Sequence, residues 1–496
     1  MKVVLISMPD VAAVIMHEAA FHMPNLGIAS LGANLDAGHE VYLIDLIRKR
    51  RNVRSYLHHT LLKIRPDLVG LSSMTWQFGT CLKLARLIKR WLPKVRIAVG
   101  GYHATLMYEE IGQTPEARPI DFLVRGEGEE ALRRLVNALG GSDDVAKIPS
   151  LSYRQADGAF VHNPRGELLD LARLKLPIRD KRRLTWGYHI MDRSVEMIET
   201  SRGCTRTCNF CSIRHMYGQS FRPFPIERIL ADIDDIYFHK KCRWIFVSDD
   251  NMVLSPPRVI ELCEAIVARK YKGLHFVVQA DCVTMSRNEE MVATMARAGF
   301  KTVFLGIENA SSKNLKTAHK GDIVGASRLA VELCHKYGIM VVGGMIFGFP
   351  DDEEADIIEN YHFLQSIDAD TSYCQILTPY PKTGIRQHLL DEGLVTNPDD
   401  FSTYNGIWAN VRTRHLDADT LQYLVWYHRQ TIMGWWEPSR QVRAQGPVWT
   451  GIWRYFFRPS LKMVLGRRLQ KIGWRGRYER DIARLKGVNR FADLES

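Results

Sequence analysis

The stretch EMIETSRGCTRTCNFC, residues 196–211, places three cysteines directly after a short run typical of a β-strand. The other six cysteines are spread singly through the 496 residues. Nine cysteines at irregular spacing are not a disulfide framework and fit a reducing compartment, so we expect a cytoplasmic protein. The three clustered thiols, Cys204, Cys208 and Cys211, are the natural candidates for soft metal ligands.

Two kinds of metal site fit this spacing. Three thiolates can hold three irons of a 4Fe-4S cluster and leave the fourth iron without a protein ligand. The alternative is a zinc site built from three cysteines and one histidine, because His215 follows Cys211 at a suitable distance in sequence. Compact zinc modules rarely open a long β/α series, which favours the iron-sulfur cluster.

A β/α series does begin at the cysteines. Six short apolar runs alternate with helical patterns, and the runs are EMIET, WIFVSDD, LHFVVQAD, TVFLGIEN, IMVVGGMIFGFP and SYCQILTPYP. Six such units are enough to curve into a (β/α)6 partial barrel, which we place at residues 191–400. Chemistry in such barrels lies on the loops that follow the strands, where the cysteines stand.

An earlier α/β series occupies residues 1–140. Its apolar runs are VVLIS, HEVYLID, DLVGLSS, RIAVGG and DFLVRGEGE, which predict a doubly wound parallel sheet. Glycine-rich loops follow two of these runs, and ligands of open parallel sheets bind at the carboxyl ends of the strands. Residues 141–190 carry turn signals and are interpreted as a linker with room for a hairpin.

The positive charge of the chain belongs to its C-terminal part. The formal net charge is +12, and residues 440–496 contain fourteen Lys and Arg against four Asp and Glu, interleaved with aromatics. We interpret residues 401–496 as a mainly helical domain that caps the barrel. Peripheral association with an anionic membrane surface is an alternative, and nucleic acid is not an expected partner. No apolar run is long enough to span a membrane, and no signal peptide is evident.

The pattern C-x-x-x-C-x-aromatic-C, formed by Cys204, Cys208, Phe210 and Cys211, resembles the signature of the radical S-adenosylmethionine (SAM) superfamily. The resemblance covers about residues 191–400. It implies that the open iron binds the amino and carboxylate groups of SAM, which answers where the missing ligand is. Reduction by a donor such as flavodoxin or ferredoxin then cleaves SAM to a 5'-deoxyadenosyl radical.

The same resemblance implies a set of SAM contacts, which includes Phe210 of the signature. Asp249 or Asp250 would meet the methionyl amino group, Glu308 the ribose, and the Gly344–Gly348 stretch the adenine through Ile346. Structural explanations exist for each, because acids at strand ends cap helices and strand glycines permit close packing.

Residues 1–140 resemble the cobalamin-binding domain that precedes the radical domain in one subgroup of the superfamily. The resemblance implies contacts to the corrin and its nucleotide tail from Ser72, Met74, Gly100, Gly101, Gly126 and Glu127. The D-x-H-x-x-G motif that supplies a lower cobalt ligand elsewhere is absent, and His17 and His22 have the wrong spacing. A plain nucleotide-type domain is the alternative.

Together these features predict a cobalamin-dependent radical SAM enzyme with a 4Fe-4S cluster. The leading hypothesis is a methyltransferase acting on an unactivated carbon of a small molecule. The basic aromatic tail favours a substrate that is large, apolar or membrane-associated. A cyclase or oxidoreductase without methyl transfer is the second hypothesis, and a non-catalytic cobalamin or iron-sulfur sensor the third. The sequence assigns no catalytic side chain.

Overall fold

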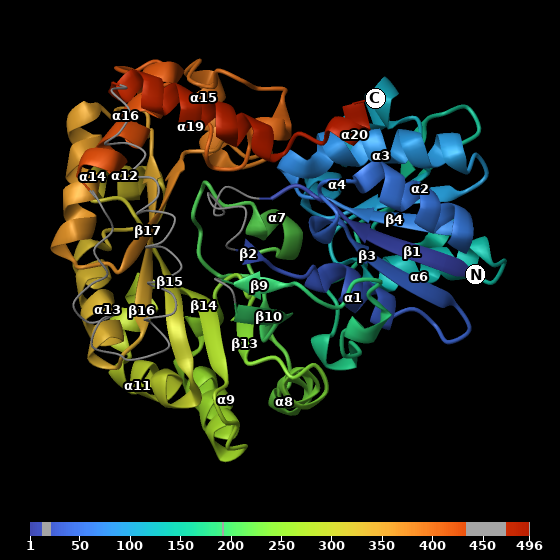
Figure 1. Ribbon diagram of the computed structural model, residues 1–496, viewed down its shortest axis with the longest axis horizontal. Helices are drawn as coiled ribbons and strands as arrows, with labels where there is room; N and C mark the ends of the chain where they lie inside the picture. Colours follow the sequence, from blue (N-terminus) through green and yellow to red (C-terminus); the bar gives the residue numbers. More distant parts are fainter. Residues whose placement is uncertain (12–20, 191–192, 433–472, 496) are drawn as a thin grey trace.

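A computed structural model describes residues 1–11, 21–190, 193–432 and 473–495, whose two large sheets face each other (Figure 1). A small third sheet pairs β11 (Ser201–Arg202) with β12 (Arg222–Pro223). The first sheet has the strand order β3-β1-β4-β5-β6-β7-β8. Its parallel strands are β1 (Lys2–Ser7), β3 (Glu40–Asp45), β4 (Leu68–Ser72), β5 (Arg96–Gly100) and β6 (Phe122–Val124).

Both faces of this first sheet are covered by helices. One core joins the sheet to α2 (Val53–Ile64) and α3 (Phe78–Trp91), and a second joins it to α1 (Leu26–Ala33) and α6 (Gly128–Leu139). A sheet buried on both faces needs aliphatic side chains throughout, which explains the VVLIS-type runs. The predicted doubly wound sheet is confirmed, and its strand order reverses direction between β1 and β4, where ligands of such sheets bind.

A hairpin completes the first sheet. Strands β7 (Leu151–Arg154) and β8 (Phe160–His162) pair antiparallel, and β7 pairs antiparallel with β6. Both strands lie within the stretch that the sequence analysis treats as a linker.

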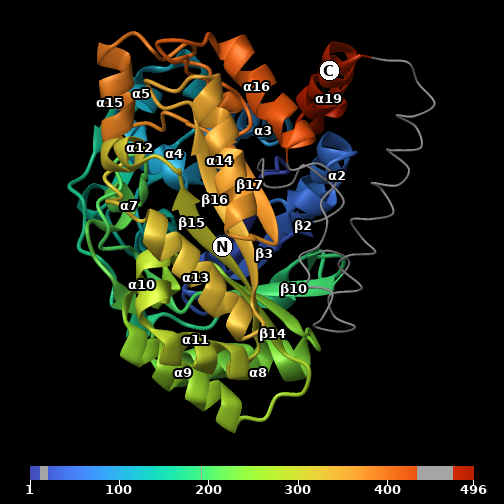
Figure 2. The same ribbon diagram turned by 90° about the vertical axis from the view of Figure 1, so that its left-hand side faces the viewer.

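The second sheet has the order β17-β16-β15-β14-β13-β10-β9-β2. Six of its strands are parallel, and they are β10 (Arg193–Ile198), β13 (Trp244–Val247), β14 (His275–Asp281), β15 (Phe300–Glu308), β16 (Met340–Phe347) and β17 (Thr371–Ile376). These are the six predicted runs, and the partial barrel is confirmed. Its outer face carries α8 (Ile226–Asp234), α9 (Pro256–Ala268), α11 (Glu289–Ala298), α13 (Val324–Lys336) and α14 (Glu354–Ser366), while its inner face looks toward the first sheet (Figures 1 and 2).

The edge of the second sheet comes from the beginning of the chain. Strand β2 (Phe21–His22) pairs antiparallel with β9 (His189–Ile190), which pairs antiparallel with β10. The first domain therefore supplies a strand to the sheet of the barrel.

The last helices connect the barrel side back to the first domain (Figure 1). Helix α19 (Trp474–Val488) packs on α16 (Ala418–Thr431), where the ring of Tyr478 lies 5.2 Å from that of Tyr423. Helix α20 (Ala492–Glu495) also reaches the first domain. Its Leu494 and the preceding Phe491 belong to the core that the first sheet forms with α2 and α3.

Most of the basic aromatic tail, residues 433–472, lies outside the described residues. Within the part of the chain that the structure describes, we find no helix with the length and apolar character needed to cross a membrane.

Candidate active site

The cysteine loop runs from β11 (Ser201–Arg202) to α7 (Ile213–Tyr217). It opens at Gly203, whose φ of +85° is in the left-handed region and whose Cβ, if present, would collide with the carbonyl oxygen of Ser220. The amide of Gly203 donates a hydrogen bond to Oδ2 of Asp250 at 2.9 Å. Glycine is thus required where the chain turns into the cysteines.

Three further contacts fix this loop to the mouth of the barrel. Arg206 forms an ion pair with Asp281 at the end of β14, with Nη2 and Oδ1 3.0 Å apart. Asn209 donates from its backbone to the carbonyl of Ala318 at 3.1 Å and from its side chain to that of Thr317 at 2.5 Å. The loop is held from two sides.

The three thiols on the loop are close enough to influence one another's ionisation. Burial raises the pKa of each of them, to about 12 at Cys211. They remain partly accessible, as does the isolated Cys374 on β17, whereas the other five cysteines are buried, namely Cys81, Cys242, Cys263, Cys282 and Cys334. The three loop thiols are therefore the clustered thiols that a cluster could reach.

The zinc alternative finds no support in the described residues. Among them, no three His, Cys, Asp or Glu side chains are arranged to hold a single metal ion. A 4Fe-4S cluster places each thiolate on a different iron, so it does not need three sulfurs around one point.

The two predicted acids after β13 have different surroundings. Asp249 is buried, and it accepts bonds from the amide and hydroxyl of Thr200, both at 2.6 Å, and from the hydroxyl of Ser201 at 2.5 Å. Asp250 faces the cavity described below, and burial, helped by the nearby Asp249 and Glu199, raises its pKa to about 7. Asp250 is the acid that is open to a ligand.

The other predicted SAM contacts lie within the barrel. Phe210 packs on the barrel core, and Gly344 lies beside the ring of Phe304, 2.6 Å from where a Cβ would stand. Ile346 is buried and its carbonyl accepts a bond from Asn309 at 3.1 Å. Glu308 ends β15 and pairs with Lys320 at 2.7 Å.

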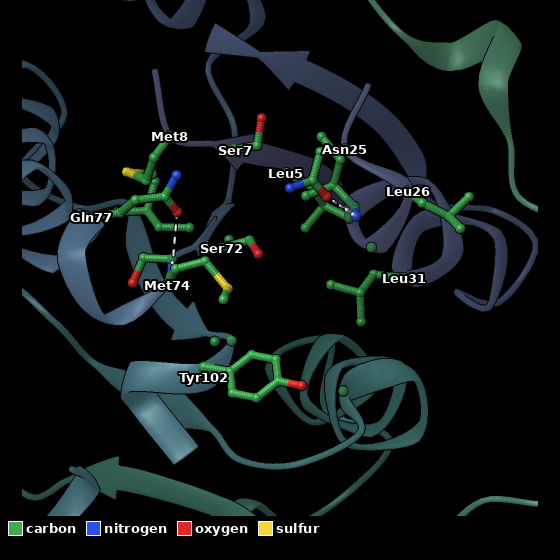
Figure 3. A pocket seen from close by; sticks show the side chains of 18 of the residues that line it. Leu5, Ser7, Met8, Asn25, Leu26, Leu31, Ser72, Met74, Gln77 and Tyr102 are labelled. Carbon is green, nitrogen blue, oxygen red and sulfur yellow. Dashed lines mark hydrogen bonds between the residues drawn. The ribbon is translucent and has the colours of Figure 1, made fainter. Parts of the chain in front are cut away.

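A cavity of about 530 Å³ separates the two domains. All six predicted cobalamin residues line it, which are Ser72, Met74, Gly100, Gly101, Gly126 and Glu127. Figure 3 shows Ser72, Met74 and Tyr102 on one side of the cavity, with Asn25, Leu26 and Leu31 opposite. The cavity therefore lies at the carboxyl ends of the strands of the first sheet.

The cavity extends between the first sheet and helices α1 and α6. Its lining there is apolar and comprises Leu5, Ile28, Leu31, Ala98, Val124 and Leu132. At the strand ends, the missing side chain of Gly101 allows backbone contact, because a Cβ would stand 2.5 Å from the carbonyl oxygen of Ser73. A Cβ at Gly126 would meet no atom within 4 Å. An apolar slot with a glycine rim fits a flat macrocycle that carries a nucleotide tail.

The opposite wall of the cavity comes from the barrel and includes Glu199, Tyr217 and Asp250. Tyr102, which follows the glycine pair, is close enough to Asp250 for the carboxylate to raise its pKa, after the larger effect of burial. One cavity thus contains both the glycine loops of the first domain and the acid beside the cysteine loop.

Salt bridges tie the two walls together. Glu127 pairs with Arg202 and Arg222, each at 3.0 Å, and Glu129 pairs with Arg202 at 2.7 Å. The carboxylate of Glu127 is therefore engaged between the domains, although its residue lines the cavity.

Sequence reasoning missed several residues of this site. Tyr102 and Arg202 stand next to recognised glycines, which was the available signal. Asp10 is buried in the cavity wall, where it accepts a bond from Thr80 at 2.8 Å while its Oδ2 has no partner among the described residues. Burial raises the pKa of Asp10 to about 7. Asp10 belongs to no sequence motif that would identify it as part of the site.

Comparison with known proteins agrees with both walls. A B12 binding domain is matched over residues 12–136, and the radical SAM superfamily over residues 198–364. The chain belongs to the radical SAM superfamily. It is a cobalamin-dependent radical SAM enzyme, and its domains imply a 4Fe-4S cluster, SAM and cobalamin as cofactors. Enzymes of this kind act on small-molecule substrates and need a reductant.

Two relatives span most of the chain. An uncharacterized methyltransferase of Pyrococcus horikoshii is 27% identical over 86% of this radical SAM enzyme and 91% of its own length. An anaerobic magnesium-protoporphyrin IX monomethyl ester cyclase of Synechocystis is 26% identical over 95% and 86%. The solved structure of the radical SAM methyltransferase TsrM from Kitasatospora setae has a TM-score of 0.66 at 18% identity, covering 86% of this chain and 81% of that one.

Proposed function

We propose that this enzyme transfers a methyl group to an unactivated carbon of a small molecule through a 5'-deoxyadenosyl radical. The observation that carries the proposal is the shared cavity, in which the glycine loops of the B12-binding domain face Asp250 beside the cysteine loop. When bound, the cluster and SAM supply the radical, and cobalamin supplies the methyl group. A substrate between the two walls would be within reach of both.

The cysteine side of the proposal assigns the cluster to Cys204, Cys208 and Cys211. Asp250 would accept the methionyl ammonium of SAM. Its raised pKa reflects burial, and a cation beside it would favour the ionised form that accepts hydrogen bonds. Asp249 is fully used by Thr200 and Ser201, so its role in this proposal is to hold the strand end.

The remaining SAM contacts are proposed from the positions of their residues. Glu308 stands at the end of β15, where a ribose hydroxyl would be met, and Gly344 and Ile346 belong to the neighbouring strand, β16. Phe210 would pack beside the cluster.

On the other wall, cobalamin would lie against the strand ends. Gly100, Gly101 and Gly126 let a ring approach the backbone, and Ser72 and Met74 follow β4 at the point where the sheet order reverses. Glu127 would act through its backbone, since its carboxylate is occupied by Arg202 and Arg222.

Product analysis of the anaerobically reconstituted holoenzyme tests the proposal. With SAM, reductant and substrate, a methyltransferase releases both 5'-deoxyadenosine and S-adenosylhomocysteine. A protein that cleaves SAM but never forms S-adenosylhomocysteine refutes methyl transfer and supports the cyclase alternative, which the similarity to the Synechocystis cyclase keeps in view. A protein that cleaves no SAM refutes both.

The neighbouring acids provide a matched pair of variants. Asp250→Asn should weaken SAM binding at least tenfold with little loss of thermal stability. Asp249→Asn should instead lower the melting temperature, because it disturbs three buried hydrogen bonds. Equal SAM affinity in wild type and Asp250→Asn contradicts the role given to Asp250.

The electron donor and the substrate class are part of the same proposal. A flavodoxin or ferredoxin would reduce the cluster, and a large apolar substrate, presented at a membrane surface, would suit the basic aromatic tail. Extraction of methyl-labelled product from a lipid fraction, rather than from the aqueous phase, would support that substrate class.

A further inference from the structure

The end of β15 carries a buried ion pair on a strained backbone. Glu308 has a φ of +66°, a left-handed conformation that costs a non-glycine residue energy unless its surroundings hold it. Its carboxylate accepts from Nζ of Lys320 at 2.7 Å, and the two side chains are only 12% and 14% exposed. The parallel register with β16 shifts between Gly306 and Glu308, which re-aims this strand end.

The loop that carries Lys320 is fastened to the cysteine loop. Thr317 and Ala318, at the end of α12 (Ser312–Thr317), accept the two hydrogen bonds that Asn209, the residue after Cys208, donates. The ion pair itself lies over Gly306, with Nζ of Lys320 3.0 Å from where a Cβ would be. A fixed positive charge is therefore held near Cys208.

The two charged groups lie on the side of the barrel to which the cysteine loop is fastened. Both charges are shielded from water, so their effects are weakly screened.

We propose that the Lys320–Glu308 pair sets the reduction potential of the cluster bound at Cys208, with Lys320 raising the potential and Glu308 lowering it. Reduction adds one electron, supplied by an external reductant, and neither forms nor breaks a bond. A nearby cation stabilises the added negative charge, and potentials of iron-sulfur clusters respond to local charge. Lys320 thus acts on the cluster through its charge and does not bind it. The inference rests on Cys208 being a cluster ligand.

Opposite charge removals provide the test. Lys320→Met and Glu308→Gln are reconstituted anaerobically, and the cluster potential is measured by redox titration followed by EPR, without SAM, so that lost ribose contacts do not enter. We expect Lys320→Met to shift the potential downward, Glu308→Gln to shift it upward, and Lys320→Arg to stay near wild type. A purely structural role would not produce shifts of opposite sign.

Unchanged potentials, or shifts of both variants in one direction, overturn the proposal. If Lys320→Met fails to assemble a cluster, Glu308→Gln alone decides, because an upward shift is required. Cys208→Ala separates the two levels of failure. If it retains a cluster with the wild-type EPR signal, the ligand assignment is wrong. If it loses that cluster while both charge variants titrate like wild type, only the role of the ion pair is refuted.

Discussion

The two walls of the cavity are built from different chemical groups. The wall of the first domain presents glycine backbone and aliphatic side chains, together with acids that already have partners, such as Asp45, Glu127 and Glu129. The barrel wall presents Glu199, Tyr217 and Asp250, and the cysteine loop begins beside Asp250. The first wall can hold a ligand by shape, because glycine and aliphatic surfaces make close contact without directed bonds. The second can hold its ligand by hydrogen bonds, and by coordination where the thiols bind a cluster. Changes to the barrel wall should therefore abolish chemistry, and changes to the first wall should alter binding and stability.

The largest effect is expected at the thiols. Cys208→Ala should reduce 5'-deoxyadenosine formation to background, because no other described cysteine stands close to the loop in an accessible position. Product formation is followed by chromatography under reducing, anaerobic conditions. Cys263→Ala, at a buried position in α9, is the matched control and should retain cleavage. Retained cleavage of SAM by Cys208→Ala would contradict the assignment of the chemistry to the barrel wall.

Asp10 is the acid of the first wall whose Oδ2 has no partner among the described residues, and its removal should change the pH dependence of stability. Burial raises its pKa from 3.8 to about 7, so the folded state keeps a proton that the unfolded state has lost. Stability therefore falls between about pH 4 and pH 7 and is constant above. Asp10→Asn lacks this loss and should gain on wild type by roughly 4 kcal/mol across that window. Urea unfolding of the apoprotein at pH 4 and pH 8 measures it, and a constant difference contradicts the assignment.

The glycine rim can be divided into fold and ligand contributions. Gly101→Ala should destabilise the apoprotein by roughly 3 kcal/mol, because it combines a φ of +99° with a clash against Ser73. Gly126→Ala, at a φ of +68° with open space around it, should cost about 1 kcal/mol yet crowd a bound corrin. Thermal unfolding and cobalamin titration of both variants distinguish the two effects. Full cobalamin affinity in Gly126→Ala would argue against a corrin at this rim.

The smallest effect is expected where the C-terminal helices meet the first wall. The side chain of Asn489 donates to and accepts from the backbone of Val11, each at 3.0 Å, next to Asp10. Asn489→Ala should cost about 1–2 kcal/mol of stability, since both hydrogen bonds to Val11 and one from Arg50 are lost. Lys486→Ala, on the exposed face of the same helix, is the control, and equal melting temperatures of the two variants would contradict the role of Asn489.

The sequence predicts what local patterns determine. The eleven parallel strands follow from aliphatic runs, and the spacing of Cys204, Cys208 and Cys211 identifies them as candidate metal ligands. The pairing of β2 with β9 joins residues far apart in sequence through two residues each, which is too short for a periodic pattern.

The missed side chains share a physical reason. Lys320 matters because the fold brings it close to Cys208, and Asp10 because burial leaves one of its oxygens without a partner among the described residues. Neither closeness in space nor burial can be inferred from the residues that adjoin Lys320 or Asp10 in the sequence. Of the two predicted acids after β13, only the hydrogen bonds of Asp249 distinguish the structural one from the open one.

The closing helix α20 also has a consequence for how the first domain can fold. Phe491 and Leu494 complete the core of that domain, although the barrel lies between them and the rest of the domain in the sequence. Contacts between such distant segments close a long loop, which costs chain entropy before they stabilise anything. We therefore expect residues 1–140 expressed alone to unfold more readily than the same residues in the full chain, and to capture a corrinoid less well.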